Sequence, residues 1–258
     1  EGKTMLVEAM LYNAGATDRI GRVEDGSTTT DYDPEEIKRQ ISISAALAPI
    51  EWQKHKINLI DVPGYFDFIG ELAAGLKLAD GAAIVVGAVS GVVVGTEKAW
   101  DHCQKGSVPR MIVISQLDRE NADFDKVLSQ LKDRYGTAIT PLQLPIVEGG
   151  AFTGYVDLID KAARLFDKKG KLRDADIPGG MEGAVEKARE AVIEAAAEND
   201  DELLEKFFGG EELTKDDILL GLRKGVLDNK AVPVVCAVGP QNLNAGAVAD
   251  VIVALMPS

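Results

Sequence analysis

The sequence predicts an α/β protein with a doubly wound, mostly parallel sheet and an α+β insertion. Short apolar runs that are typical of buried strands alternate with amphipathic helical runs over residues 57–147. The alternation then stops, and it returns only near the C-terminus. We therefore expect one domain built from residues 1–147 and 231–258, with residues 148–230 inserted into it as a smaller unit.

Composition limits the class of protein. The chain has 258 residues, of which 46% are hydrophobic and 27% are charged, and this balance suits a packed core. The formal net charge of −14 argues against a wide basic face, so we expect no direct binding to DNA. No apolar run is long enough to cross a membrane, and nothing resembles a signal peptide. We expect a monomer in the cytoplasm, with Cys103 and Cys236 as reduced thiols.

One loop organises the functional prediction. Asp61-Val62-Pro63-Gly64-Tyr65 follows an apolar run that is typical of a strand. In an open α/β sheet, ligands bind outside the carboxyl ends of the strands. A carboxylate followed by a Pro-Gly turn at such a point suits the sensing of a nucleotide's terminal phosphate and of its Mg²⁺ ion.

The N-terminus carries a second phosphate signal. Gly2-Lys3-Thr4 opens a helical run and matches the second half of a P-loop, G-x-x-x-x-G-K-[ST]. In that interpretation Lys3 reaches the terminal phosphates and Thr4 ligates Mg²⁺. The alternative is an ordinary helix start with Thr4 near the cap. A P-loop needs a strand and the first half of the loop, so we expect both to precede Glu1 in the natural sequence.

The remaining elements follow from periodicity. Residues 45–51 and 57–61 predict a β-hairpin, and residues 16–42 predict a long polar loop that is either functional or disordered. Further strands are expected over residues 82–88, 111–114, 142–147, 152–159, 162–167 and 232–236, with a turn at 168–171. Helices are expected from residue 5 to near residue 15 and over 69–78, 96–105, 123–135, 181–197, 200–208, 214–225 and 247–255.

Several segments occur in a characteristic order. They are Gly2-Lys3-Thr4, then residues 39–44, 61–68 and 117–124. Together they resemble the G domain of bacterial elongation factor G. Within the expected insertion, residues 152–158 and 209–214 resemble that factor's G′ subdomain, and residues 255–258 resemble the end of its G domain. The resemblance implies a P-loop GTPase fold within a longer translational GTPase, and it suggests that the insertion meets a ribosomal stalk protein.

The resemblance also implies ligands and roles. The ligands are GTP or GDP with Mg²⁺, and the partner of the full-length protein is the ribosome. Thr4 and Ser42 would ligate Mg²⁺ through hydroxyls, and Asp61 would hold it through a water molecule. Catalysis would fall to Lys3 and to Tyr65. The remaining nucleotide contacts would come from Gly2, Gly64, Ser115, Gln116, Asp118, Val238 and Gly239.

Some positions depart from the family pattern. Tyr65 replaces the His that positions the attacking water, and a neutral phenol cannot supply an imidazolium, so we expect slow hydrolysis. Ser115-Gln116 replaces Asn-Lys of the guanine motif while Asp118 is kept. Val238-Gly239 replaces Ser-Ala of the second guanine loop, so we expect weakened guanine preference. Gln40 replaces the glycine that the family has before the switch I isoleucine. A residue suited to special dihedral angles is lost there, so we expect switch I to order differently. These departures resemble divergent paralogues of the factor.

Three functions are open at this point. The first is a GTPase of translation that acts on the ribosome. The second is a nucleotide-binding or docking module with little or no catalysis. The third, a generic P-loop ATPase or metabolic kinase, is the weakest because it leaves Asp118 and the insertion unexplained.

Overall fold

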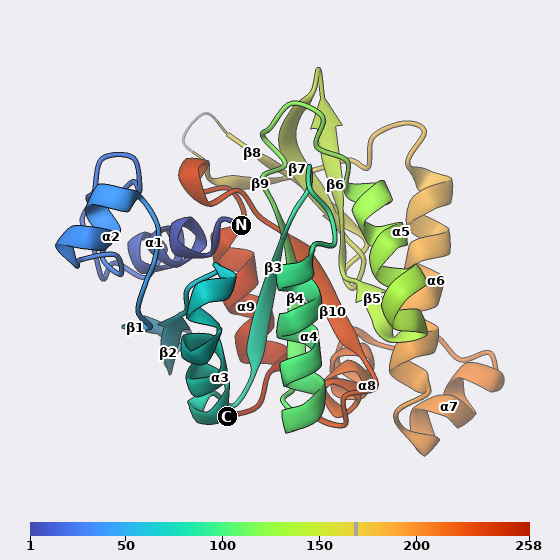
Figure 1. The fold of residues 1–258 in the computed structure, drawn as a ribbon. Coiled ribbons are helices and arrows are strands. Elements are labelled where there is room, and N and C mark those ends of the chain that lie inside the picture. The colour runs from blue at the N-terminus through green and yellow to red at the C-terminus, as the bar shows by residue number, and fades with distance from the viewer. Residues whose placement is uncertain (168–169) are drawn as a thin grey trace.

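A parallel sheet lies at the centre of the molecule. The computed structural model describes residues 1–167 and 170–258. Within them, a four-stranded parallel sheet has the order β3-β4-β10-β5 (Figure 1). Its strands are β3 (Ala82–Gly87), β4 (Arg110–Ser115), β5 (Ile139–Pro141) and β10 (Val232–Cys236). The predicted α/β fold class with a parallel sheet is therefore confirmed.

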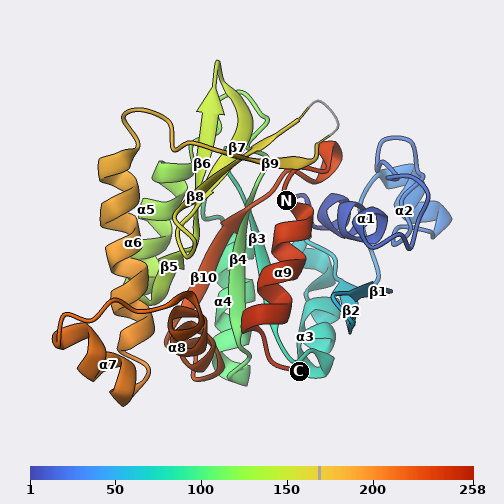
Figure 2. The same cartoon turned by 180° about the vertical axis from the view of Figure 1, so that it is seen from behind.

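Helices cover both faces of this sheet. α4 (Val94–Gly106) and α5 (Phe124–Tyr135) lie on one face (Figure 1), whereas α8 (Lys215–Leu227) and α9 (Ala245–Leu255) lie on the other (Figure 2). Along β4, Met111 and Val113 enter the core beneath α9, while Ile112 and Ile114 enter the core beneath α5. Burial on both faces explains why the strand is a continuous apolar run. No helix in the described ranges is both long and apolar enough to span a membrane.

The predicted hairpin is present as a separate two-stranded sheet. β1 (Ala46–Trp52) pairs antiparallel with β2 (His55–Asp61), from Ala46 opposite Asp61 to Trp52 opposite His55. Gln53 and Lys54 form the turn with φ angles of 47° and 66°, the positive values that a tight two-residue hairpin turn requires. Trp52 donates its indole N–H to Asp250 of α9 at 2.7 Å, which anchors the tip.

The following segment differs in part from the prediction. The expected strand at 142–147 is β6 (Gln143–Glu148), and it belongs to an antiparallel sheet of order β6-β7-β8-β9. The chain changes sheets at Leu142, whose N–H donates to Val234 in the parallel sheet and whose carbonyl accepts from Leu158. The other strands are β7 (Ala151–Asp157), β8 (Ala162–Phe166) and β9 (Leu172–Ala175). Residues 168–169 of the expected turn lie outside the described residues.

Three helices complete the expected insertion. They are α6 (Glu182–Ala197), α7 (Asp201–Phe208) and α8. Val185 of α6 and Leu222 of α8 are fully buried in the same apolar cluster as Leu6 of α1 (Lys3–Asn13) and Val248 of α9. The helices of residues 182–227 therefore share a hydrophobic core with α1 and α9.

Two buried glutamates order the long polar segment after α1. Glu8 of α1 accepts the N–H groups of Gly21 at 2.8 Å and Thr29 at 2.5 Å. Glu36 of the short helix α2 (Pro34–Arg39) accepts the N–H groups of Asp33, Ile43 and Ser44 at 2.9–3.1 Å. Both side chains are buried, and each of their carboxylate oxygens accepts at least one of these bonds. Backbone donors that no strand or helix satisfies are thus satisfied by side chains.

Gln40 adopts a backbone conformation that is unusual for a residue other than glycine. This residue keeps the left-handed conformation that a glycine favours, with φ 56° and ψ 38°. Its N–H caps α2 at the carbonyl of Glu36, and its side-chain amide donates to the carbonyl of Glu24 at 3.1 Å. A left-handed non-glycine residue costs about 1–2 kcal/mol, and these bonds offset part of that cost.

Glu36→Ala tests the ordering role of the buried glutamate. The substitution leaves three partly buried N–H groups without this acceptor, so we expect the free energy of unfolding to fall by about 2–4 kcal/mol. Glu35→Ala is the matched control because Glu35 is exposed and makes only surface ion pairs, with Lys38 and Arg39. It should cost about 0.5 kcal/mol or less. Urea unfolding measures both, and equal losses would contradict the ordering role.

Candidate functional site

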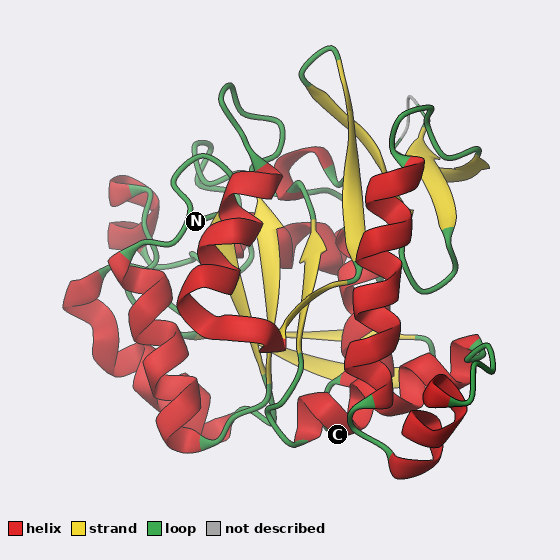
Figure 3. Ribbon diagram, turned by 90° about the vertical axis from the view of Figure 1, so that its right-hand side faces the viewer, coloured by secondary structure: helices red, strands yellow, loops and turns green. Residues whose placement is uncertain are grey.

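The N-terminus of α1 lies at the carboxyl ends of the parallel strands. Ser115, the last residue of β4, donates its hydroxyl to the carbonyl of Glu1 at 2.8 Å. The side chain of Glu1 in turn accepts the N–H of Gly87, the last residue of β3, at 3.1 Å. Figure 3 shows the N-terminus beside the arrowheads of the strands. This is the edge of the sheet at which ligands bind in open α/β folds.

Gly2 and Lys3 form the start of this site. Gly2 has φ 86°, a left-handed angle that suits glycine, and its carbonyl accepts the N–H of Leu6 at 2.9 Å. The Lys3 side chain reaches Gly64, because a Cβ atom at Gly64 would lie 2.6 Å from Lys3 Nζ. Burial lowers the pKa of Lys3, and the charges of Asp61 and Glu1 oppose this shift. The helix N-terminus and the ammonium group together favour an anion at this point.

The candidate metal ligands converge next to Lys3. Thr4 Oγ1 lies 3.2 Å from Ser42 Oγ, so the two predicted hydroxyl ligands are hydrogen-bonded to each other. Thr30 donates its hydroxyl to Asp61 Oδ2 at 2.8 Å. Asp61 is only 4% exposed, and its Oδ1 has no hydrogen-bond partner in the described part of the chain. Burial raises the pKa of Asp61, while the hydrogen bond from Thr30, the nearby Thr4 hydroxyl and the charge of Lys3 oppose the shift.

This set of atoms fits Mg²⁺. An unpartnered, buried carboxylate oxygen is costly unless a ligand or water satisfies it. No group of three or more His, Cys, Asp or Glu side chains in the described ranges is arranged to hold a metal alone. Mg²⁺ is usually held by one or two carboxylates together with waters and substrate phosphates, so a mixed hydroxyl–carboxylate set is sufficient for it.

Sequence reasoning missed Thr30 and Asp31. Asp31 is 5% exposed and lies close to Ser42. Burial raises the pKa of Asp31, and the nearby Asp61 carboxylate adds to that rise. The available signal was a Ser-Thr-Thr-Thr-Asp run within an irregular segment. That signal is weak, because only the folding of the segment around Glu8 and Glu36 brings the run to Asp61.

Tyr65 lies at the mouth of the site. It follows Gly64 directly and precedes the 3₁₀ turn η1 (Phe66–Phe68), which leads into α3 (Ile69–Leu78). The Tyr65 side chain is 58% exposed, and its neighbour Phe66 is 65% exposed. The Tyr65 side chain is therefore at the surface, one residue after the glycine that Lys3 reaches.

The candidate base-binding residues lie on two adjacent loops. Ser115 is buried, and Gln116 follows it with a left-handed φ of 62°. Asp118 is half-buried, and its Oδ2 accepts the side-chain amide of Gln241 at 3.2 Å. The sequence prediction did not include Gln241.

The second base loop lies against α1. Val238 is fully buried, and its N–H donates to the carbonyl of Leu243 at 2.9 Å. Gly239 begins the 3₁₀ turn η3 (Gly239–Gln241), where a Cβ atom would lie 2.6 Å from the Met5 carbonyl group. Only glycine fits this close approach. The two base loops therefore meet the same end of α1 as the phosphate-binding candidates.

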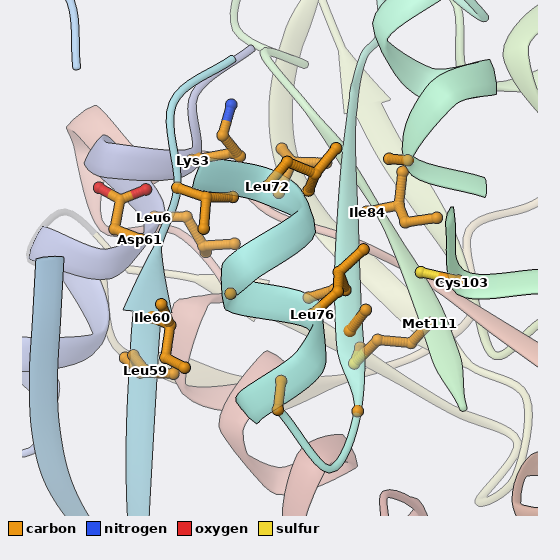
Figure 4. Close-up of a pocket in the computed structure, with 18 of the residues that line it drawn as sticks. Lys3, Leu6, Leu59, Ile60, Asp61, Leu72, Leu76, Ile84, Cys103 and Met111 are labelled. Carbon is orange, nitrogen blue, oxygen red and sulfur yellow. The ribbon is translucent and has the colours of Figure 1, made fainter. Parts of the chain in front are cut away.

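A cavity of about 680 Å³ separates β2 from β3. Lys3 and Asp61 lie along its wall (Figure 4). Most of the lining consists of apolar side chains from α1, β2, α3, β3, α4 and β4. These include Leu6, Leu59, Ile60, Leu72, Leu76, Ile84, Cys103 and Met111. Since β2 and β3 belong to different sheets, the cavity is the gap between those sheets.

The comparisons with known proteins agree with this geometry. The family described as "Elongation factor Tu GTP binding domain" matches residues 1–258. The fold is similar to a crystal structure of a protein from Thermus thermophilus, with a TM-score of 0.94 and 37% sequence identity. The match covers 100% of this chain and 38% of that one, so the chain spans well under half the length of its relative. The chain belongs to the elongation factor Tu GTP-binding domain family and is a GTP-binding G domain of the elongation-factor type.

Proposed function

We propose that this chain is the nucleotide switch of a longer translational GTPase that acts on the ribosome. The observation that carries the proposal is the cluster of Lys3, Thr4, Ser42 and Asp61. Asp61 Oδ1 has no partner among the described residues and is available to a hydrated cation. A monomeric state and a cytoplasmic location belong to the same proposal. Residues 1–147 and 231–258 would form the nucleotide-binding part, with 148–230 as its insertion.

The proposed nucleotide contacts follow from the positions of the side chains. Lys3, the Gly2 turn and the amide of Gly64 would bind the β- and γ-phosphates at the N-terminus of α1. Thr4 and Ser42 would ligate Mg²⁺, and Asp61 would hold it through a water molecule. The bound ion would neutralise phosphate charge in the transition state.

The base would lie across the two adjacent loops. Asp118 would accept hydrogen bonds from guanine N1 and N2, with Ser115 and Gln116 on one side of the base. Val238 and Gly239 would form the other side through their backbone. Because these loops lack several of the family's polar side chains, we propose that guanine preference is present but weakened.

The Thr30–Asp61 bond supports a switching mechanism. It joins the segment after α1 to the end of β2 at a point next to the proposed γ-phosphate site. Contacts from the γ-phosphate would hold both segments, and hydrolysis would release them, which is the general logic of nucleotide switches. Hydrolysis transfers the γ-phosphoryl group to water and leaves GDP. Tyr65 would orient that water less effectively than an imidazole, so the reaction would be slow.

The cavity between β2 and β3 supports a further element of the proposal. Its apolar walls and the two strand edges that flank it suit one extended, apolar segment. We propose that the strand expected before Glu1 lies there and joins the hairpin to the parallel sheet. It would deliver the first half of the phosphate loop to Gly2.

Nucleotide binding tests this function. We expect a protein that carries the preceding strand and complete phosphate loop to bind GDP and GTP more tightly than ATP. The chain of residues 1–258 alone should bind both guanine nucleotides at least about tenfold more weakly, because it lacks half of the loop amides. Calorimetric titration measures both proteins. Binding without preference for guanine would favour the alternative function, a docking module. The altered base loops are the observation that supports this alternative.

Tyr65→His tests the proposed cause of slow hydrolysis. The imidazole can orient and polarise the attacking water, so ribosome-stimulated phosphate release should rise by about tenfold or more. GDP affinity should stay unchanged, since Tyr65 is exposed and belongs to neither base loop. Tyr65→Phe is the control for the hydroxyl. A stimulated rate that is equal in the wild type and in Tyr65→His would show that Tyr65 does not limit turnover.

A further inference from the structure

One side-chain contact joins the two proposed base loops. The amide of Gln241 donates from Nε2 to Oδ2 of Asp118 at 3.2 Å. Asp118 follows β4, and Gln241 closes the turn after β10, which is the strand next to β4 in the sheet. The two residues are 123 positions apart in the sequence, so only the pairing of these strands brings them together.

The turn that carries Gln241 is held independently of this contact. Val238 and Leu243 exchange two backbone hydrogen bonds, each of 2.9 Å. Asn242 adopts a left-handed φ of 54° and exchanges side-chain amide bonds with Asn13 of α1 at 2.8 and 2.9 Å. Gly239 packs against the backbone of Met5. The Gln241 side chain is therefore presented from a fixed turn, and its bond to Asp118 is not needed to hold that turn.

The contact leaves Asp118 able to bind a base. A carboxylate has about four acceptor positions, and Gln241 occupies one of them on Oδ2. The remaining positions suit the parallel N–H groups of a guanine Watson–Crick edge. A donated hydrogen bond also limits rotation of the carboxylate, so less freedom is lost when the base binds.

No other side chain of the turn after β10 is placed to donate a hydrogen bond to Asp118. Val238 is apolar and fully buried, and Gly239 has no side chain. Gln241 is the residue of the turn whose side chain reaches Asp118. We propose that Gln241 is a positioning residue for base selection, which orients the Asp118 carboxylate toward guanine and compensates for the missing polar group at position 238. This inference rests on the proposed function, because it assigns a role within the same nucleotide site.

The test measures affinities of the full-length protein for GDP, IDP and ADP. IDP lacks the 2-amino group of guanine, and ADP presents an acceptor where guanine has its N1–H. In Gln241→Ala, GDP binding should weaken by about five- to tenfold, which corresponds to the loss of one modest hydrogen bond. ADP binding should stay unchanged, and IDP binding, which keeps only the N1–H bond to Asp118, should weaken less than GDP binding, so the preference for GDP over both IDP and ADP should fall.

Two further variants separate positioning from folding. Gln241→Lys keeps an N–H donor on a chain of similar length, so it should restore the preference for GDP. Gln53→Ala is the matched control, because Gln53 also donates to a carboxylate, that of Asp250 at 2.8 Å, but at the hairpin tip. It should leave all three affinities unchanged.

The outcomes distinguish the inference from the proposed function. Unchanged affinities in Gln241→Ala, or an equal loss for all three nucleotides, would overturn the positioning role while the guanine preference of the wild type stands. Failure of the wild-type protein to prefer GDP over ADP would instead overturn the proposed function, and the positioning role with it.

Discussion

The buried carboxylate of Asp61 is the constraint on which the site depends. It ends β2, lies beside Lys3, and receives the hydroxyl of Thr30 while its second oxygen has no partner in the described residues. A carboxylate removed from water in this way is costly unless cations and donors surround it. The neighbouring segments are arranged so that they supply a cation and hydrogen-bond donors to this carboxylate. The amino end of α1 supplies Lys3 and Thr4, and the polar segment after α1 supplies Thr30.

That polar segment is ordered from within by carboxylates. Glu8 and Glu36 accept buried and partly buried backbone N–H groups of this segment, and they bring Thr30, Asp31 and Ser42 to the end of β2. The segment has few apolar contacts of its own, so its order depends on a small number of charge-assisted hydrogen bonds. Such a segment can lose its order when one charge beside it, such as that of a γ-phosphate, is removed. A nucleotide switch requires this property.

The sequence predicted the elements that have a regular pattern of buried residues. β4 and β10 are continuous apolar runs between two layers of helices, and the α5 pattern shows one apolar face. It did not predict β5, which has only three residues, or the place of β6 in the antiparallel sheet, since no local pattern marks a change of sheet at Leu142. The Gly-Lys-Thr and Asp-x-Pro-Gly segments could be identified because their spacing is local. Asp31 and Gln241 could not, because their roles depend on contacts between residues far apart in the chain.

The central claim is that Asp61 holds a hydrated Mg²⁺ ion at the terminal phosphates. Its most direct test is the Mg²⁺ dependence of GTP affinity in the full-length protein, compared with Asp61→Asn, which keeps an acceptor for Thr30 but removes the charge. The account predicts that Mg²⁺ tightens GTP binding by about tenfold or more in the wild type, or about 1.4 kcal/mol, and that Asp61→Asn loses most of this gain. GTP binding that is indifferent to Mg²⁺ in the wild type, or an equal gain in both proteins, would contradict it.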